Sequence, residues 1–228
     1  MAVIEGGASG VVAETGAIGA KALHTVGKPT DAGALGHYRF SVVTGTLAAA
    51  LAANAQLFQF KWTDATRLAV VTAIETKFLT LTRFTAGTIT DFGLDAFIAR
   101  SYGGGGGGTA LTVSGDNMAV RASMGTTLVS EIRVATTAGL TAATTLDTQP
   151  FEQSLGGMGA QVVPSATIQV MDSAENANLS YRPRMESGEH PIVLAQNEGI
   201  VIRNRAVWPV AGTGIYSFMM EWAEVTAF

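Results

Sequence analysis

Short segments in which apolar and polar residues alternate recur from His37 to the end of the chain. In the clearest of them, near the C-terminus, bulky apolar residues occupy every second position: Tyr216, Phe218, Met220 and Trp222. A period of two places successive side chains on opposite faces of a strand, so this pattern is typical of half-buried β-strands. Because no amphipathic helical period recurs, the pattern predicts an all-β fold.

About ten segments qualify as strands, and Val, Ile, Thr and aromatic residues, which favour strands, are common in them. The expected strands are 38–42, 58–62, 68–81, 92–100, 110–113, 129–135, 166–171, 192–194, 199–205 and 215–225. About ten strands separated by Gly- and Thr-rich loops fit a jelly-roll-like antiparallel β-sandwich. The segment 47–55 is rich in Ala, so we expect a helical turn or a loop there.

Residues 1–36 differ from the rest of the chain. They are rich in Gly and Ala and show neither the strand period nor the helix period. We therefore expect an extended N-terminal arm over 1–36 and a β-sandwich domain over 37–228. The alternative for the arm is a short capping helix around 19–24.

The composition is apolar and poor in charge. Of 228 residues, 47% are hydrophobic and only 14% are charged, whereas charged residues usually supply about 25% of a globular domain. The net charge of −4 argues against a nucleic-acid partner. The long uncharged stretch 40–60 is interrupted by polar residues, so we expect no membrane contact. A surface with so little charge is expected to be covered by other protein.

Residues for catalysis or cofactor binding are scarce. The chain has no cysteine, which excludes thiol nucleophiles, disulfides and Cys-based zinc sites. No metal-ligand spacing joins His24, His37 and His190. The glycine run 103–108 formally contains a dinucleotide fingerprint, but a strand rather than a helix is expected after it, so we interpret it as a flexible loop. We predict no catalytic, cofactor or metal residues.

Two pairs of carboxylates are candidates for paired acids. Asp91 and Asp95 are four positions apart and would share a face of a strand, whereas Glu221 and Glu224 would not. Asp91 and Asp95 could approach one cation, but Ca²⁺ usually takes six to eight oxygen ligands. We therefore expect a solvated edge at this pair.

Arginine outnumbers lysine, and four arginines occur in two close pairs. Arg182 and Arg184 form one pair, and Arg203 and Arg205 form the other. The planar guanidinium suits protein interfaces, and no aromatic residues alternate with these arginines as in nucleic-acid grooves. We predict these four residues and Trp208, which precedes a proline and can be exposed, as interface candidates.

The C-terminal part of the chain carries a set of short motifs. Residues 190–203 read H-P-I-V-L-A-Q-N-E-G-I-V-I-R, followed by W-P at 208–209, T-G at 213–214 and M-E-W-A-E at 220–224. This combination resembles the ending of a group of tailed-bacteriophage virion proteins. The resemblance implies a virion component, in particular a jelly-roll capsid decoration (cement) protein, and it brings no catalytic residues.

The resemblance implies a non-enzymatic virion protein that binds and stabilises the capsid shell, and the low charge and the expected arm suit such a protein. The expected partners are the major capsid protein and further copies of the chain, as a homo-oligomer and in particular a trimer, with neither nucleic acid nor membrane. The expected place is the capsid surface, after synthesis in the host cytoplasm.

Two other functions remain open at this point. A receptor- or carbohydrate-binding β module of a head fibre or tail tip would need exposed aromatic side chains. Alternation places Trp62 and Trp222 in the core, which leaves Trp208 for such a platform. A jelly-roll enzyme of the cupin type would need clustered metal-binding histidines.

Overall fold

The computed structural model describes residues 3–6, 11–14, 36–82, 84, 90–102, 106–113, 118–120, 125–141, 144–155, 157–162, 168–171, 178–184 and 188–227. All regular structure in these ranges is β-strand. In the same ranges, no helix is long and apolar enough to span a membrane. The all-β prediction is confirmed.

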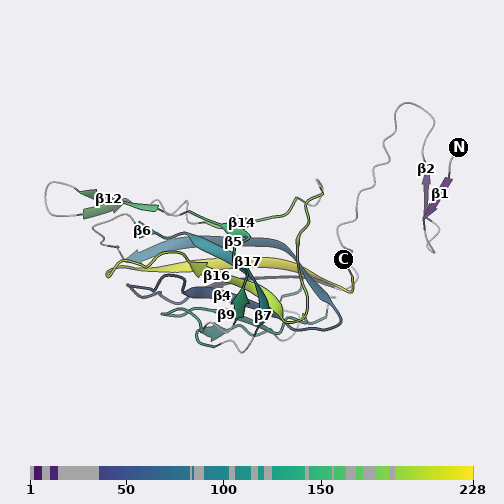
Figure 1. Cartoon of the computed structure of the whole chain (residues 1–228), viewed down its shortest axis with the longest axis horizontal. Helices are drawn as coiled ribbons and strands as arrows, with labels where there is room; N and C mark the ends of the chain where they lie inside the picture. The colour runs from purple at the N-terminus through teal and green to yellow at the C-terminus, as the bar shows by residue number, and fades with distance from the viewer. Residues whose placement is uncertain are drawn as a thin grey trace, which may run out of the picture.

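Two antiparallel sheets form the body of the molecule and are stacked as the layers of a sandwich (Figure 1). The first, here called the β5–β17 sheet, has the order β14 (Ser180–Tyr181), β5 (Leu68–Thr82), β17 (Thr213–Val225) and β3 (His37–Val43), with β15 (Ile192–Leu194) also paired to β5. The second, the β7–β16 sheet, has the order β10 (Thr144–Leu146), β7 (Leu94–Tyr102), β16 (Glu198–Asn204), β4 (Gln56–Trp62), β9 (Glu131–Val134) and β8 (Thr109–Ala110), with β11 (Glu152–Gln153) also paired to β7.

The strand pairs are nested along the chain. The early strand β3 pairs with the last strand, β17, and the next strand, β4, pairs with β16. Between β4 and β16 in the sequence, β5 pairs with β14 and β15, and β7 pairs with β10 and β11. Pairing of β5 with β17 and of β7 with β16 then joins the nested pairs into two sheets.

Aromatic side chains from both sheets fill the space between the layers. The residues of β17 that the sequence pattern assigned to the core are all buried. The ring of Trp222 lies edge-on to Phe60 of the opposite sheet with centroids 5.2 Å apart, and Phe218 stacks on Phe58 of that sheet at 5.3 Å. Burying one such ring contributes about 1.5–3 kcal/mol, so these contacts between the layers hold the sheets together.

The Ala-rich segment 47–55 does not form the helical turn that was considered for it. Ala50 and Asn54 have positive φ angles of 56° and 60°, which interrupt a right-handed helix. Its backbone amides bond to distant strands and loops instead: Leu47 N donates to Gly214 O and Ala50 N to Pro209 O. Tertiary hydrogen bonds have overridden the helical propensity of alanine here.

Outside the sandwich, two smaller antiparallel sheets are described. In the predicted arm, β1 (Val3–Gly6) pairs with β2 (Val11–Glu14) as a hairpin. The segment 15–35, with the helix considered at 19–24, lies outside the described residues, so the extended arm stays a prediction. The other sheet joins β13 (Ile168–Met171), β12 (Gly157–Val162) and β6 (Thr90–Asp91).

Candidate interaction surface

The face of the β5–β17 sheet that turns away from the core is partly apolar and open. Even-numbered residues of β17 such as Phe218 enter the core, so odd-numbered residues lie on this outer face. The ladders place the outward residues side by side: Ile215 beside Leu79, Ser217 beside Lys77 and Val43, and Met219 beside Glu75 and Ser41.

Five of these outward residues form what we call the apolar outer face: Val43, Leu79, Leu81, Ile215 and Met219. Val43, Leu79 and Leu81 are 50%, 55% and 47% exposed, and Ile215 and Met219 are half-buried. Single exposed apolar residues are ordinary, but a group on adjacent strands is a candidate contact surface. Sequence reasoning did not select this group. The sequence does contain a sign of this group: near the end of β5, apolar residues occur at both even-numbered and odd-numbered positions, and therefore on both faces of the strand.

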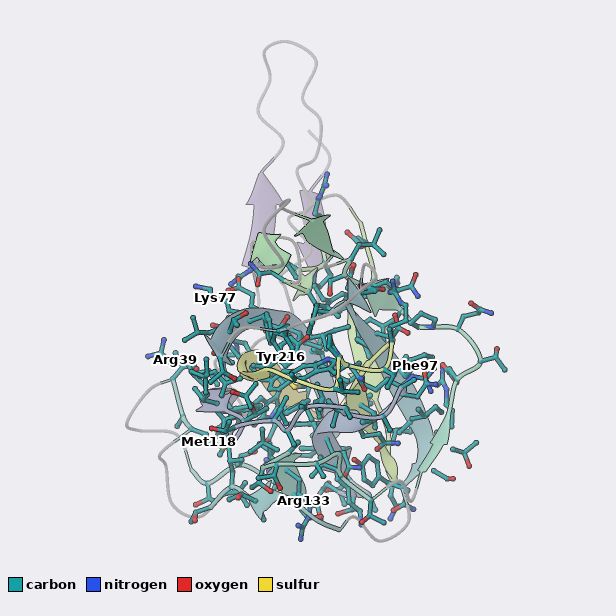
Figure 2. All side chains as sticks on the ribbon, turned by 90° about the vertical axis from the view of Figure 1, so that its left-hand side faces the viewer. Arg39, Lys77, Phe97, Met118, Arg133 and Tyr216 are labelled. Atoms are coloured by element: carbon teal, nitrogen blue, oxygen red, sulfur yellow. The ribbon has the colours of Figure 1, made fainter. Side chains whose placement is uncertain are left out.

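Charged residues surround the apolar outer face. Among the described residues, three cations (Arg39, Lys77 and Arg182) and two carboxylates (Glu75 and Glu221) lie on or beside it. Their charges sum to +3 − 2 = +1, whereas the whole chain carries −4. Figure 2 shows Arg39 and Lys77 reaching outward on one side of the molecule, with Phe97 on the opposite side. The apolar outer face is therefore slightly basic on an acidic protein.

The opposite end of the same sheet face is buried. Val70, Ala223 and Val225 form a small apolar cluster separate from the main core, with exposed fractions of 0%, 0% and 5%. One end of this face is thus covered within a single chain, and the end around Leu79 is not.

The outer face of the β7–β16 sheet is also covered. Phe97 and its cross-strand neighbour Val201 are 2% and 0% exposed. The guanidinium of Arg203 lies 4.1 Å from the centre of the Phe97 ring. The Tyr102 ring packs on Gly199, where an added Cβ would come within 2.8 Å of the ring and 2.2 Å of a backbone oxygen. Side chains of this chain therefore close the surface.

Arg205 joins the two carboxylates that were considered as paired acids. Its Nη2 lies 2.5 Å from Asp95 Oδ1, and its Nη1 lies 3.2 Å from Asp91 Oδ2. Gln153 Nε2 donates to the same Asp95 oxygen at 3.1 Å. The prediction of a solvated edge is wrong for Asp95, which is only 6% exposed. The nearby carboxylates raise the pKa of Arg205, and the hydrogen bonds that Arg205 donates to Asp95 are the main cause.

The other two predicted interface arginines lie elsewhere. Arg182 forms an ion pair with Glu75 on β5, with 2.6 Å between Nη2 and Oε1, and its side chain is 56% exposed. Arg184 is exposed, and its backbone N–H donates to Glu189 Oε2 at 2.8 Å. Of the four arginines, Arg182 adjoins the apolar outer face, whereas Arg203 and Arg205 stabilise the β7–β16 sheet internally.

Trp208 is a core residue, so its assignment as an exposed interface residue needs correction. It is 2% exposed and lies edge-on to Phe84 and Phe78, with ring centroids 5.3 and 5.8 Å away. The adjacent proline does not expose it, because aromatic residues from distant segments enclose the indole. Trp62 and Trp222 are fully buried, as predicted. None of the three tryptophans offers a stacking platform for a sugar.

Part of the glycine run is fixed in place rather than a free loop. Thr141 N donates to Gly106 O at 2.9 Å, and Arg133 Nη1 donates to Gly107 O at 2.8 Å. Gly107 and Gly108 have φ angles of +75° and +56°, which glycine adopts without strain. Residues 103–105 lie outside the described residues, so their predicted flexibility stays a prediction.

Glu224 is the one fully buried carboxylate among the residues described. Its Oε1 accepts hydrogen bonds from the Thr127 hydroxyl, from Leu128 N at 2.9 Å and from Trp222 Nε1 at 3.3 Å, while its Oε2 has no partner. Burial raises the pKa of this carboxyl, and the hydrogen bonds oppose that shift. Its position in the strand, three residues from Glu221, excludes the pairing of acids that was considered.

No group of three or more His, Asp or Glu residues that could hold a metal ion occurs in the part of the chain that the structure describes. The chain matches no known protein family, no curated protein and no solved structure at a significant level. The apolar outer face is therefore the strongest candidate for a functional surface.

Proposed function

We propose that this chain is a non-enzymatic structural protein of a tailed-bacteriophage particle, a decoration protein that binds the capsid shell as an oligomer and stabilises it. The observation that carries the proposal is the apolar outer face, where Val43, Leu79 and Leu81 are about half exposed on a rigid sheet. The resemblance of residues 190–224 to the ending of virion proteins supports the same conclusion.

The strand topology supports a jelly roll as the more specific fold. A jelly roll is a two-sheet fold built from two Greek keys, in which distant strands of the chain lie side by side. The nested pairs β3–β17, β4–β16, β5–β14/β15 and β7–β10/β11 have this form. Such a sandwich is a stiff body that can bridge neighbouring subunits of a shell.

Stabilising a shell requires a contact area larger than the apolar outer face alone. Permanent assemblies commonly bury about 2,000–5,000 Å², and the centre of such interfaces is poor in charge. The low charge content of the chain, 14%, suits a protein with much of its surface in such contacts. The partners in this proposal are the major capsid protein and other copies of the chain, as a trimer.

Imaging tests this proposal. An antibody raised against the purified chain is applied to particles of the phage that encodes it, and gold-labelled antibody is located by electron microscopy. The proposal predicts label distributed over the head. Label confined to the tail tip would support the receptor-binding alternative, and particles without label, together with absence of the chain from their protein content, would contradict a virion role.

A further inference from the structure

The segment 125–129, which precedes β9, is attached to the sandwich through side chains that can ionise. The Tyr38 hydroxyl donates to the first carbonyl of the segment at 3.1 Å. The hydroxyl of Thr127 and the backbone N–H of Leu128 both donate to Glu224 Oε1. Within the described part of the chain, these are the hydrogen bonds that join the segment to the sandwich. A carboxyl and a phenol therefore hold this segment, where a strand would be held by a backbone ladder.

The hydrogen bonds of Glu224 have the pattern expected of a neutral carboxyl. The side chain is fully buried, and Oε1 accepts from Thr127, from Leu128 and from Trp222, whereas the buried Oε2 has no partner. In a protonated carboxyl one oxygen is the acceptor and the other carries the proton, whereas an ionised carboxyl is negative on both oxygens. Burying a charged oxygen without a donor is costly. The closed arrangement therefore fits the protonated form.

The elements packed around Glu224 bring little charge to it. The segment 125–129 carries none, and Ala69, its cross-strand neighbour on β5, is apolar. Tyr38 of β3 is a neutral phenol at ordinary pH, because burial raises its pKa above the usual 10.0. Arg67 is the one cation among the described residues that acts on Glu224, and it favours the ionised form. Burial outweighs Arg67 and the hydrogen bonds, so the pKa of the Glu224 carboxyl is raised.

We propose that Glu224 is a pH-sensitive latch, which holds the segment 125–129 on the sandwich when protonated and lets it open to water when ionised. Opening allows water to solvate both carboxyl oxygens, and the proton leaves to the solvent. The open population rises as the pH increases from the ordinary pKa of 4.5 through the closed-state pKa. The rise is about tenfold for each unit by which closure raises that pKa. The latch does not depend on the proposed virion role.

The latch lies where the predicted arm joins the sandwich. Glu224 N donates to Gly36 O at 3.0 Å, and Gly36 packs against the Tyr38 ring. Opening of the segment 125–129 also removes the acceptor of the Tyr38 hydroxyl at this point. Acid therefore tightens the sandwich beside Gly36, and a higher pH loosens it.

Hydrogen exchange of the full-length protein tests the latch. Exchange of peptides that cover 125–130 is followed by mass spectrometry from pH 4.5 to pH 8, and each rate is divided by the intrinsic rate at that pH. We expect the protection of these peptides to fall at least threefold over this range in the native chain. Glu224→Gln has the shape of the protonated form and cannot ionise, so its protection should stay constant. Peptides covering 151–154 serve as the internal control, because Phe151 N and Ser154 N donate to backbone carbonyls of β7.

Three results would overturn the latch. One is the same pH dependence in the native chain and in Glu224→Gln. Another is an equal loss of protection at 151–154, which would show that the whole sandwich opens. The third comes from Thr127→Val, which removes one donor and keeps the carboxyl: we expect the protection of 125–130 at pH 8 to fall at least threefold, and unchanged protection would contradict the proposal. Circular dichroism of each variant establishes that it is folded.

Discussion

The outer faces of the two sheets differ in what covers them. On the β7–β16 sheet, Phe97 and Val201 are almost fully buried, and Arg203 and Tyr102 close the surface above the strands. On the β5–β17 sheet, Leu79 is 55% exposed. The same chain therefore completes one face with its own side chains and leaves apolar area on the other, and the proposed function assigns a partner to that open area.

Ion pairs follow the same division. Arg100 is held by Asp147 at 2.9 Å and by Glu198 at 3.1 Å, and Arg205 is held by Asp95, all on the β7–β16 side. The apolar outer face has one described ion pair beside it, between Arg182 and Glu75. Arg205 and Asp95 adjoin the covered face, and the charge-assisted hydrogen bonds between them are stronger than neutral ones.

The largest expected difference between the two faces concerns stability. Phe97→Ala removes a ring buried by the chain itself and should lower the free energy of unfolding by about 3–5 kcal/mol. Leu79→Ala removes an exposed side chain and should change it by less than about 0.5 kcal/mol in the dissociated chain. Urea unfolding at low protein concentration measures both. Equal losses would show that the two faces do not differ as described.

The second expected difference concerns the arginines. Arg205→Met leaves the carboxylate of Asp95 largely buried without its cation, and should cost about 1.5–3 kcal/mol, the range for a hydrogen bond to a charged group. Arg182→Met breaks an exposed pair and should cost less than about 1 kcal/mol. Thermal unfolding of the two variants compares them. A larger loss for Arg182→Met would contradict the structural role given to Arg205.

The smallest effect concerns pH. Because the pKa of Glu224 is raised in the folded state, folding favours the protonated carboxyl. This contribution to the stability of the fold is fully present below the ordinary pKa of 4.5 and is lost as the pH rises through the folded-state pKa. Glu224→Gln should therefore unfold less readily than the native chain at pH 7, with the difference shrinking toward pH 4.

Arg67 favours the ionised form of Glu224. The pKa of Tyr38 is raised mainly by burial and, to a smaller extent, by the charge of Glu224. Unfolding curves of the native chain and the variant from pH 4 to pH 8 provide the measurement. A difference that grows toward low pH would contradict the assignment.

Strand positions could be predicted from the sequence because burial alternates where a strand separates core from surface. The segments 68–81 and 215–225 correspond closely to β5 and β17. Trp208 could not be placed, because its neighbours Phe78, Phe84 and Phe92 come from segments far away in the chain. Alternation of apolar and polar residues with a period of two identifies the two faces of a strand, but it carries no information on what covers each face.

The same limit applies to the charged residues and to the segment 47–55. The pair Arg205 and Asp95 is separated by 110 residues and meets only because β16 lies beside β7. The segment 47–55 has helical composition, yet its amides bond to strands and loops that only the folded chain brings together. Predicting either feature requires the strand order, which local patterns do not contain.

The central claim is that the apolar outer face mediates contact between copies. Sedimentation equilibrium of the full-length protein tests it most directly, with Leu79→Glu as the disrupting variant and Leu155→Glu as the control at another exposed leucine. We expect an oligomer for the native chain and for Leu155→Glu, and dissociation toward the mass of one chain, 23.5 kDa, for Leu79→Glu. An unchanged oligomer in Leu79→Glu, or a native chain that is monomeric at all concentrations, would contradict the claim.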